Sequence, residues 1–187
     1  MSEKDQVDIG LSSAHRLLHP MHTALVSCIG NDGRPNIITL AWVMPTSIRP
    51  PLIAMSIAPK RHSYHLIEET EEFVVNIPTM RILRETLFCG RKSGRSHDKI
   101  KELDLTILPA RKVKSPIIGE CVAHLECKLR SNFVTGDHTL FIGEIIEAYA
   151  DKGVFKEKYD LERASMIFHL GDNDFATLKP KIHTPKI

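Results

Sequence analysis

Two long extended stretches, separated by only three residues, constrain the fold of this chain most strongly. Residues 121–134 read CVAHLECKLRSNFV, residues 138–150 read HTLFIGEIIEAYA, and TGD stands between them. Gly136 and Asp137 suit a tight turn, so the two stretches are predicted to pair as an antiparallel hairpin. Neither face of 138–150 is cleanly polar, which indicates that both sides of this strand are partly covered.

Shorter elements precede this hairpin. Residues 22–29 and 36–45 flank the turn sequence GNDGRP, which predicts a second hairpin. Residues 52–57 and 73–78 are further strand candidates, and SYHLIEETEE at 63–72 predicts a helix. Strands that come in hairpins with few intervening helices favour a mainly β fold, a closed or nearly closed antiparallel barrel with short helical insertions.

Length and composition fit one domain. A chain of 187 residues with 42% hydrophobic residues can bury roughly 70% of the surface that its unfolded form exposes. We expect a single domain over residues 1–187, with a core at about 15–150 and a C-terminal extension at 151–187. This extension is expected to pack on the barrel or on a partner subunit.

Charge and hydropathy exclude several classes of protein. The formal net charge is +2, which lacks the strong imbalance of a generic nucleic-acid binder. No apolar run approaches the ~18 residues that a membrane-spanning helix needs. The sequence therefore predicts a soluble, cytoplasmic protein with no nucleic-acid or membrane partner.

Cysteine and histidine spacing gives little support for disulfides or metals. The four cysteines, Cys28, Cys89, Cys121 and Cys127, form no CxxC pair, and buried free thiols are the favoured interpretation. Cys89 alone lies near cations in the sequence. The ten histidines include no HExxH motif, so no zinc site is predicted.

Three segments could carry chemistry. Residues 56–63, SIAPKRHS, run from a strand end into a helix start, where unpaired amides and cations suit a phosphate. Ser63 could equally be a helix N-cap. Residues 89–99, CGRKSGRSHDK, match neither common nucleotide-binding loop and read either as a solvated loop or as part of a site. His138 directly follows the TGD turn and is either an exposed turn residue or a ligand contact.

Taken in order, these segments resemble the flavin reductase-like family of FMN-binding split-barrel proteins. The matching stretches cover roughly residues 15–150, and the resemblance continues into the C-terminal extension at HLGDNDFATL. They read NDGRPNIITLAW, PPLIAMSIAPKRHSYHLI, EFVVNIP, CGRKSGRSHDK and GDHTLFIGEI. The resemblance implies a Greek-key-like split β-barrel that forms a homodimer and binds FMN non-covalently near the subunit interface.

The same resemblance assigns residues to the flavin ring. The strand beside the ring corresponds to Thr39, Leu40, Ala41 and Trp42. Ser56 and Ile57 match positions along the ribityl chain. His138 matches the family histidine near the ring and the nicotinamide, and it is the one residue predicted to take part in catalysis.

The phosphate positions are also assigned by resemblance. Arg61, Ser63 and Lys99 match the phosphate-binding positions, and Ser93 and Gly94 match the loop that closes over the cofactor. The family usually has Thr or Ser directly after its basic residue. Here His62 intervenes, which leaves a shift of the phosphate assignment by one residue open.

The implied function is an oxidoreductase in which NAD(P)H delivers hydride to bound FMN. The electrons would then pass to free flavin, to oxygen, or to a partner such as a monooxygenase. The alternative is a flavoredoxin-like electron-transfer protein that uses no nicotinamide. A barrel that has lost its cofactor is a third interpretation, against which the intact set Ser56, Arg61, Ser63 and Lys99 argues.

Overall fold

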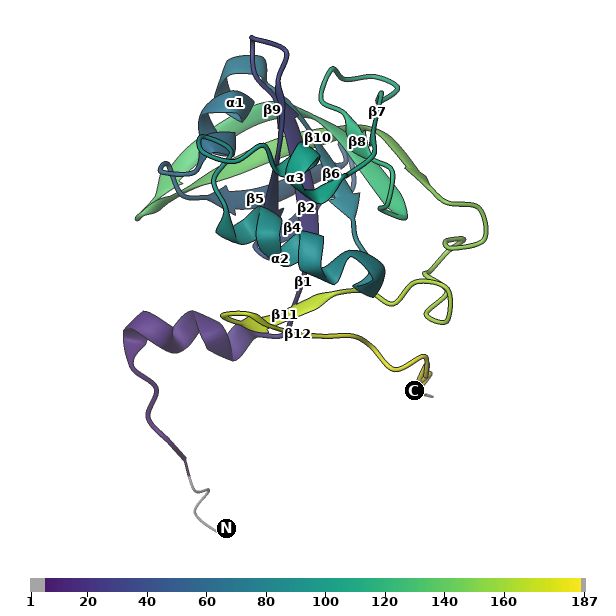
Figure 1. The fold of residues 1–187 in the computed structure, drawn as a ribbon. Coiled ribbons are helices and arrows are strands. Elements are labelled where there is room, and N and C mark those ends of the chain that lie inside the picture. The colour runs from purple at the N-terminus through teal and green to yellow at the C-terminus, as the bar shows by residue number, and fades with distance from the viewer. Residues whose placement is uncertain (1–5, 186–187) are drawn as a thin grey trace.

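A computed structural model describes residues 6–185 as a mainly β fold with short helices (Figure 1). The helices are η1 (Leu11–Leu18), α1 (His62–Thr70), η2 (Met80–Ile82), α2 (Leu83–Arg91) and α3 (Lys99–Leu103). The strands are β1 (Met21–His22), β2 (Ala24–Ile29), β3 (Pro35–Leu40), β4 (Val43–Ser47), β5 (Leu52–Ile57), β6 (Glu72–Ile77), β7 (Ile107–Leu108), β8 (Ile117–Ile118), β9 (Ala123–Thr135), β10 (His138–Ala150), β11 (Phe168–Gly171) and β12 (Asp174–Ala176). The predicted antiparallel, mainly β class is confirmed.

The long hairpin predicted at the TGD turn is formed by β9 and β10. Its register pairs Thr135 with His138 at the turn, where Gly136 takes a φ of 67°. A glycine is also required at Gly143, because a Cβ there would lie 2.3 Å from the ring of Phe73. The absence of a side chain at Gly143 thus lets a fully buried aromatic ring pack against β10.

The seven-stranded sheet runs in the order β3-β2-β6-β9-β10-β5-β4. Residues 36–45, predicted as one strand, are therefore two strands at opposite edges of the sheet, so that prediction was wrong. Only residues 41–42 join β3 to β4, and the sheet must curl until its two edges approach each other. The Ser56 amide donates to the Trp42 carbonyl at 3.0 Å, which fixes this crossing against β5.

Both faces of the sheet are covered. One cluster fills the interior and includes Val26, Phe73 and Phe141. A second, which includes Leu25 and Ile37, lies between the sheet and helices α2 and α3. Because β2 alternates between these clusters, almost all of it is buried, and the sheet holds α2 firmly beside β3.

Helices α1, α2 and α3 begin or end at residues other than those that the sequence predicts. Helix α1 begins at His62 with Arg61 as its N-cap residue, so Ser63 lies inside the first turn and its interpretation as N-cap was wrong. The expected loop at 89–99 is shorter, because α2 continues to Arg91 and α3 begins at Lys99. Only residues 92–98 connect the two helices.

The C-terminal extension folds against the N-terminal segment. Strands β11 and β12 form a hairpin that adds to β1. In Figure 1 this small sheet lies beneath the main sheet, and the purple helix η1 extends beside it. Within residues 6–185 no helix is both long and apolar enough to span a membrane.

Burial explains part of the cover expected for β10 and supports the interpretation of the thiols. Phe141 is fully buried in the interior of its own chain, so it needs no cover from a partner subunit. All four cysteines are buried free thiols, as predicted. Burial raises the pKa of the Cys28 thiol to about 12 and that of Cys89 to about 11, so neither is a reactive thiolate near neutral pH.

Candidate functional site

Two adjoining cavities contain every site residue predicted from the sequence. The first, of about 260 Å³, is called the Trp42 cavity and is lined by Thr39, Leu40, Ala41, Trp42, Ser56, Ile57, Arg61 and His138 among others. The second, of about 190 Å³, is called the Lys99 cavity and is lined by Arg61, Ser63, Ser93, Gly94 and Lys99 among others. Because both include Arg61, Ile38 and Gly90, they form one groove with two ends.

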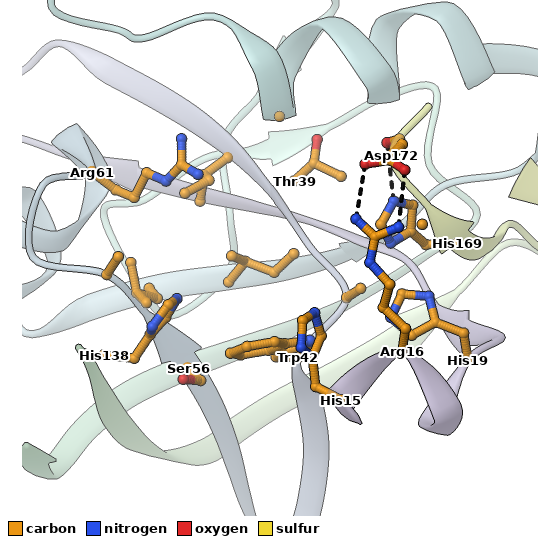
Figure 2. A pocket seen from close by; sticks show the side chains of 17 residues that line it. His15, Arg16, His19, Thr39, Trp42, Ser56, Arg61, His138, His169 and Asp172 are labelled. Atoms are coloured by element: carbon orange, nitrogen blue, oxygen red, sulfur yellow. Dashed lines mark hydrogen bonds and ion pairs between the residues drawn. The ribbon is translucent and has the colours of Figure 1, made fainter. Parts of the chain in front are cut away.

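The crossing from β3 to β4 forms the wall of the Trp42 cavity. Trp42 is 38% exposed, and its indole lies 5.0 Å from the His138 ring and 5.8 Å from the His15 ring, measured between centroids. In Figure 2 Trp42 lies between these two histidines. This arrangement offers a planar ligand an aromatic surface and backbone groups along one edge.

His138 begins β10 and is held by its neighbour. Its Nδ1 lies 2.8 Å from an oxygen of the Asp137 carboxylate. The hydrogen bond to His138 holds the pKa of the Asp137 carboxyl below its usual value. With Nδ1 engaged as a donor, Nε2 is the ring nitrogen left for a ligand.

Segments outside the barrel close the opposite end of the Trp42 cavity. Arg16 of η1 makes two hydrogen bonds of 3.0 and 3.1 Å to the carboxylate of Asp172, and Figure 2 shows this pair far from Arg61. His19 and His169 lie beside it, with ring centroids 5.2 Å apart. No local sequence pattern indicates these cavity residues, because contacts between positions about 150 residues apart leave no trace among neighbouring residues.

The Lys99 cavity is strongly cationic. It is lined by Lys60, Arg61, Lys92 and Lys99, and no Asp or Glu lines it within the described part of the chain. The first turn of α1 begins beside this cavity, and its N-cap residue, Arg61, makes no side-chain capping hydrogen bond. A positive helix end beside a guanidinium makes a site for a phosphate.

Ser63 and Lys99 lie at this cavity but already have partners. Asn36 donates from Nδ2 to Ser63 Oγ at 2.7 Å, and both residues are buried. The Lys99 ammonium donates to the carbonyls of Cys89 and Lys92 at 3.1 and 3.2 Å and to the Ile37 carbonyl. Lys99 therefore ties the end of α2 to β3, and its charge can act on an anion without a direct contact.

Burial and neighbouring cations lower the pKa of two basic groups in the Lys99 cavity. Burial lowers the pKa of Lys99. Burial, together with the charges of Arg95 and Lys99, lowers the pKa of His62. An anion in the cavity would offset this accumulated positive charge.

The connection between α2 and α3 passes over the Lys99 cavity. Gly94 approaches so closely that a Cβ would lie 2.2 Å from Asn36 Oδ1 and 2.9 Å from His62. Arg95 donates from Nη1 to the Lys60 carbonyl at 2.8 Å. Only a glycine permits this approach, which holds the loop against the start of α1.

The donors present fit FMN and do not fit a metal. A phosphate monoester carries a charge near −2 at neutral pH, which matches the cationic, acid-free Lys99 cavity. A planar ring system matches the aromatic and backbone wall of the Trp42 cavity. Among residues 6–185 no group of three or more His, Cys, Asp or Glu side chains could hold a metal ion.

Comparison with known proteins gives a family. The model of the flavin reductase like domain matches residues 15–170. The chain belongs to the flavin reductase-like family. An uncharacterized protein of Pyrococcus abyssi is 34% identical over 90% of this chain and 96% of its own length. A flavin reductase of Pseudomonas putida is 26% identical over 82% of this chain and 81% of its own.

A solved structure agrees over nearly the whole chain. Flavoredoxin of Desulfovibrio vulgaris (Miyazaki F) superposes with a TM-score of 0.85 at 26% identity, covering 97% of both chains. This superposition confirms the split-barrel expectation for the fold of this flavin reductase-like chain. The match includes the β11–β12 region as well as the main sheet, so the C-terminal extension belongs to the shared fold.

Proposed function

We propose that this protein binds FMN in the groove formed by the Trp42 and Lys99 cavities and catalyses hydride transfer from NAD(P)H to flavin. The observation that supports this most is the pairing of an anion-binding end with an aromatic end, joined at Arg61. Membership of the flavin reductase-like family supports the same conclusion. When bound, FMN would supply the redox chemistry, accepting the hydride and later releasing the electrons.

The residues of the chain would position the cofactor. Arg61 and the amides of the first α1 turn would hold the phosphate with charge-assisted hydrogen bonds. The loop at 92–98 would cover the phosphate, and the buried Lys99 ammonium would add positive charge without contacting the phosphate directly. The strand crossing at Thr39–Trp42 would support the ring by backbone contacts and the indole face.

His138 would act on the nicotinamide side of the site. Its Nδ1 is engaged by Asp137, so its Nε2 would orient the nicotinamide carboxamide or lie close to the negative charge of reduced flavin. No nucleophile is required.

Anaerobic mixing of the FMN-loaded protein with NADH and with NADPH tests the proposed reaction. A reductase should bleach the visible flavin absorbance rapidly with at least one of them. A flavoredoxin-like carrier, the alternative suggested by the structural similarity, would stay yellow with both and bleach only with a reducing protein partner. A stable yellow colour would therefore refute nicotinamide dependence while leaving FMN binding intact.

His138→Ala is expected to slow this reduction by roughly 10- to 100-fold, equivalent to about 1.4 to 2.7 kcal/mol of transition-state stabilisation. FMN affinity should stay unchanged, because His138 lies at the aromatic end of the groove and away from the Lys99 cavity. Stopped-flow reduction and FMN titration measure the two effects separately. A wild-type reduction rate would show that His138 only completes the turn.

We further propose that the protein is a homodimer and that η1 contributes to the interface. No residue of η1 is buried within its own chain. Leu11, Leu17 and Leu18 are 93%, 70% and 73% exposed, and exposed leucines clustered on one short helix indicate a contact surface. Light scattering should give twice the 21.1 kDa chain mass, and the mass of a single chain at micromolar concentration would contradict the proposal.

The cellular setting forms part of the proposal. Four free thiols suit a reducing compartment, so we place the protein in the cytoplasm. Electrons held on the flavin would pass to free flavin, to oxygen or to a redox partner such as a monooxygenase. Activity assays that offer each acceptor to the reduced protein distinguish these routes.

A further inference from the structure

A third cavity, here called the Phe175 cavity, lies beside the Trp42 cavity and has no role in the proposed function. It encloses about 220 Å³ between α2, β3 and the β11–β12 hairpin. Five residues line both cavities: Thr39, Ala41, Gly90, His169 and Asp172. A ligand in the Phe175 cavity would therefore lie next to the aromatic end of the groove.

The wall of the Phe175 cavity combines apolar and polar groups. Leu87 and Phe175 supply apolar surface from α2 and β12. Thr23 also lines the cavity; it is 3% exposed, and its hydroxyl finds no hydrogen-bond partner anywhere in residues 6–185. A buried hydroxyl without a partner is costly unless a ligand or water satisfies it.

Arg91 brings to the cavity a guanidinium that forms no side-chain ion pair within residues 6–185. Its Nε donates to Asn173 Oδ1 at 2.9 Å, and its Nη2 donates to the backbone carbonyl of Asp172. The carboxylate of Asp172 is occupied by Arg16, and Arg91 makes no ion pair with any side chain in the described part of the chain. Hydrogens on Nη1 and Nη2 remain for an anion, in the fork that binds a carboxylate with two hydrogen bonds.

We propose that the Phe175 cavity binds a single-ring aromatic carboxylate. A cavity of 150 Å³ holds benzene, so about 220 Å³ holds one ring with a substituent. The carboxylate would bind Arg91, the ring would pack on Leu87 and Phe175, and the Thr23 hydroxyl would bond to a ligand oxygen. This inference rests on the proposed function only in that FMN occupies the neighbouring groove.

Calorimetric titration of the FMN-saturated protein with benzoate tests this site, with benzyl alcohol as the uncharged probe. Benzoate should bind at least tenfold more tightly than benzyl alcohol. Arg91→Gln should weaken benzoate binding by about tenfold or more and leave benzyl alcohol unaffected. Arg84→Gln, an exposed arginine on the same helix that lies outside the cavity lining, is the matched control and should bind benzoate as the wild type does.

Thr23→Val supplies a second, independent variant. It should weaken both probes by roughly fivefold without lowering the melting temperature, because the hydroxyl loses no bond within the protein. FMN affinity should be the same in all variants.

Three results would overturn the proposal: no benzoate binding, equal benzoate affinity in Arg91→Gln, or displacement of FMN by benzoate. If the chain does not take up FMN, that result refutes the proposed function. The same titrations on the FMN-free protein would still decide whether the cavity binds the acid.

Discussion

Arg61→Ala is expected to weaken FMN binding by about 1.5 to 3 kcal/mol, the range for a hydrogen bond to a charged group. Arg61 is exposed, stands directly before α1 and lines both cavities of the groove. It makes no ion pair with another described residue, so its guanidinium is available for an external anion. Fluorescence titration with FMN measures the loss, which corresponds to roughly 10- to 150-fold in Kd.

The control for Arg61→Ala is Arg84→Ala, which removes another exposed arginine that lines neither cavity. This variant should bind FMN as the wild type does. The melting temperature of both variants should stay close to that of the wild type, because neither guanidinium is buried. Wild-type FMN affinity in a folded Arg61→Ala protein would remove Arg61 from the phosphate site.

Glu126→Ala is expected to destabilise the fold by about 3 kcal/mol or more. Glu126 is fully buried on β9, where its carboxylate accepts the backbone amides of Arg111, Lys112 and Val113 at 2.8, 2.6 and 3.2 Å. The Tyr149 hydroxyl donates to it at 2.9 Å. Truncation would leave four donors without an acceptor and a cavity in place of the carboxylate. Urea denaturation of the variant and the wild type measures the difference.

The same carboxylate predicts a dependence of stability on pH. Burial alone would raise the pKa of Glu126, but the three amides and the Tyr149 hydroxyl outweigh burial and lower it. A depressed folded-state pKa gives stability that is complete above the unfolded pKa, near 4.3, and is lost as pH falls through the folded value. The free energy of unfolding should therefore drop in acid, and Glu126→Gln should be less stable at neutral pH and drop less.

Local sequence patterns predicted the parts of the fold that depend on neighbouring residues. The β9–β10 hairpin follows from two extended stretches joined at Gly136, and its register is set by that turn. The break between β3 and β4 could not be predicted in the same way. Residues 36–45 form one largely apolar stretch without a turn sequence, and only the pairing of β4 with β5 on the far edge of the sheet divides it.

The candidate site likewise contains residues that local sequence patterns predict and contacts that these patterns could not predict. Resemblance to the family located Arg61, Trp42 and His138, since each lies in a recognisable segment. It could not show that Lys99 already donates to three carbonyls, because those oxygens belong to three separated positions. Nor could it place Arg16 against Asp172, a contact that exists only once the C-terminal hairpin has packed beside η1.

Titration of the FMN-free protein with FMN and with riboflavin tests the flavin site most directly, because the two ligands differ only in the phosphate. If the Lys99 cavity holds the phosphate, FMN should bind at least about 100-fold more tightly, as expected for two or more charge-assisted hydrogen bonds. High salt should narrow that difference. Equal affinity for the two ligands, or no uptake of either, would contradict the assignment of this groove to FMN.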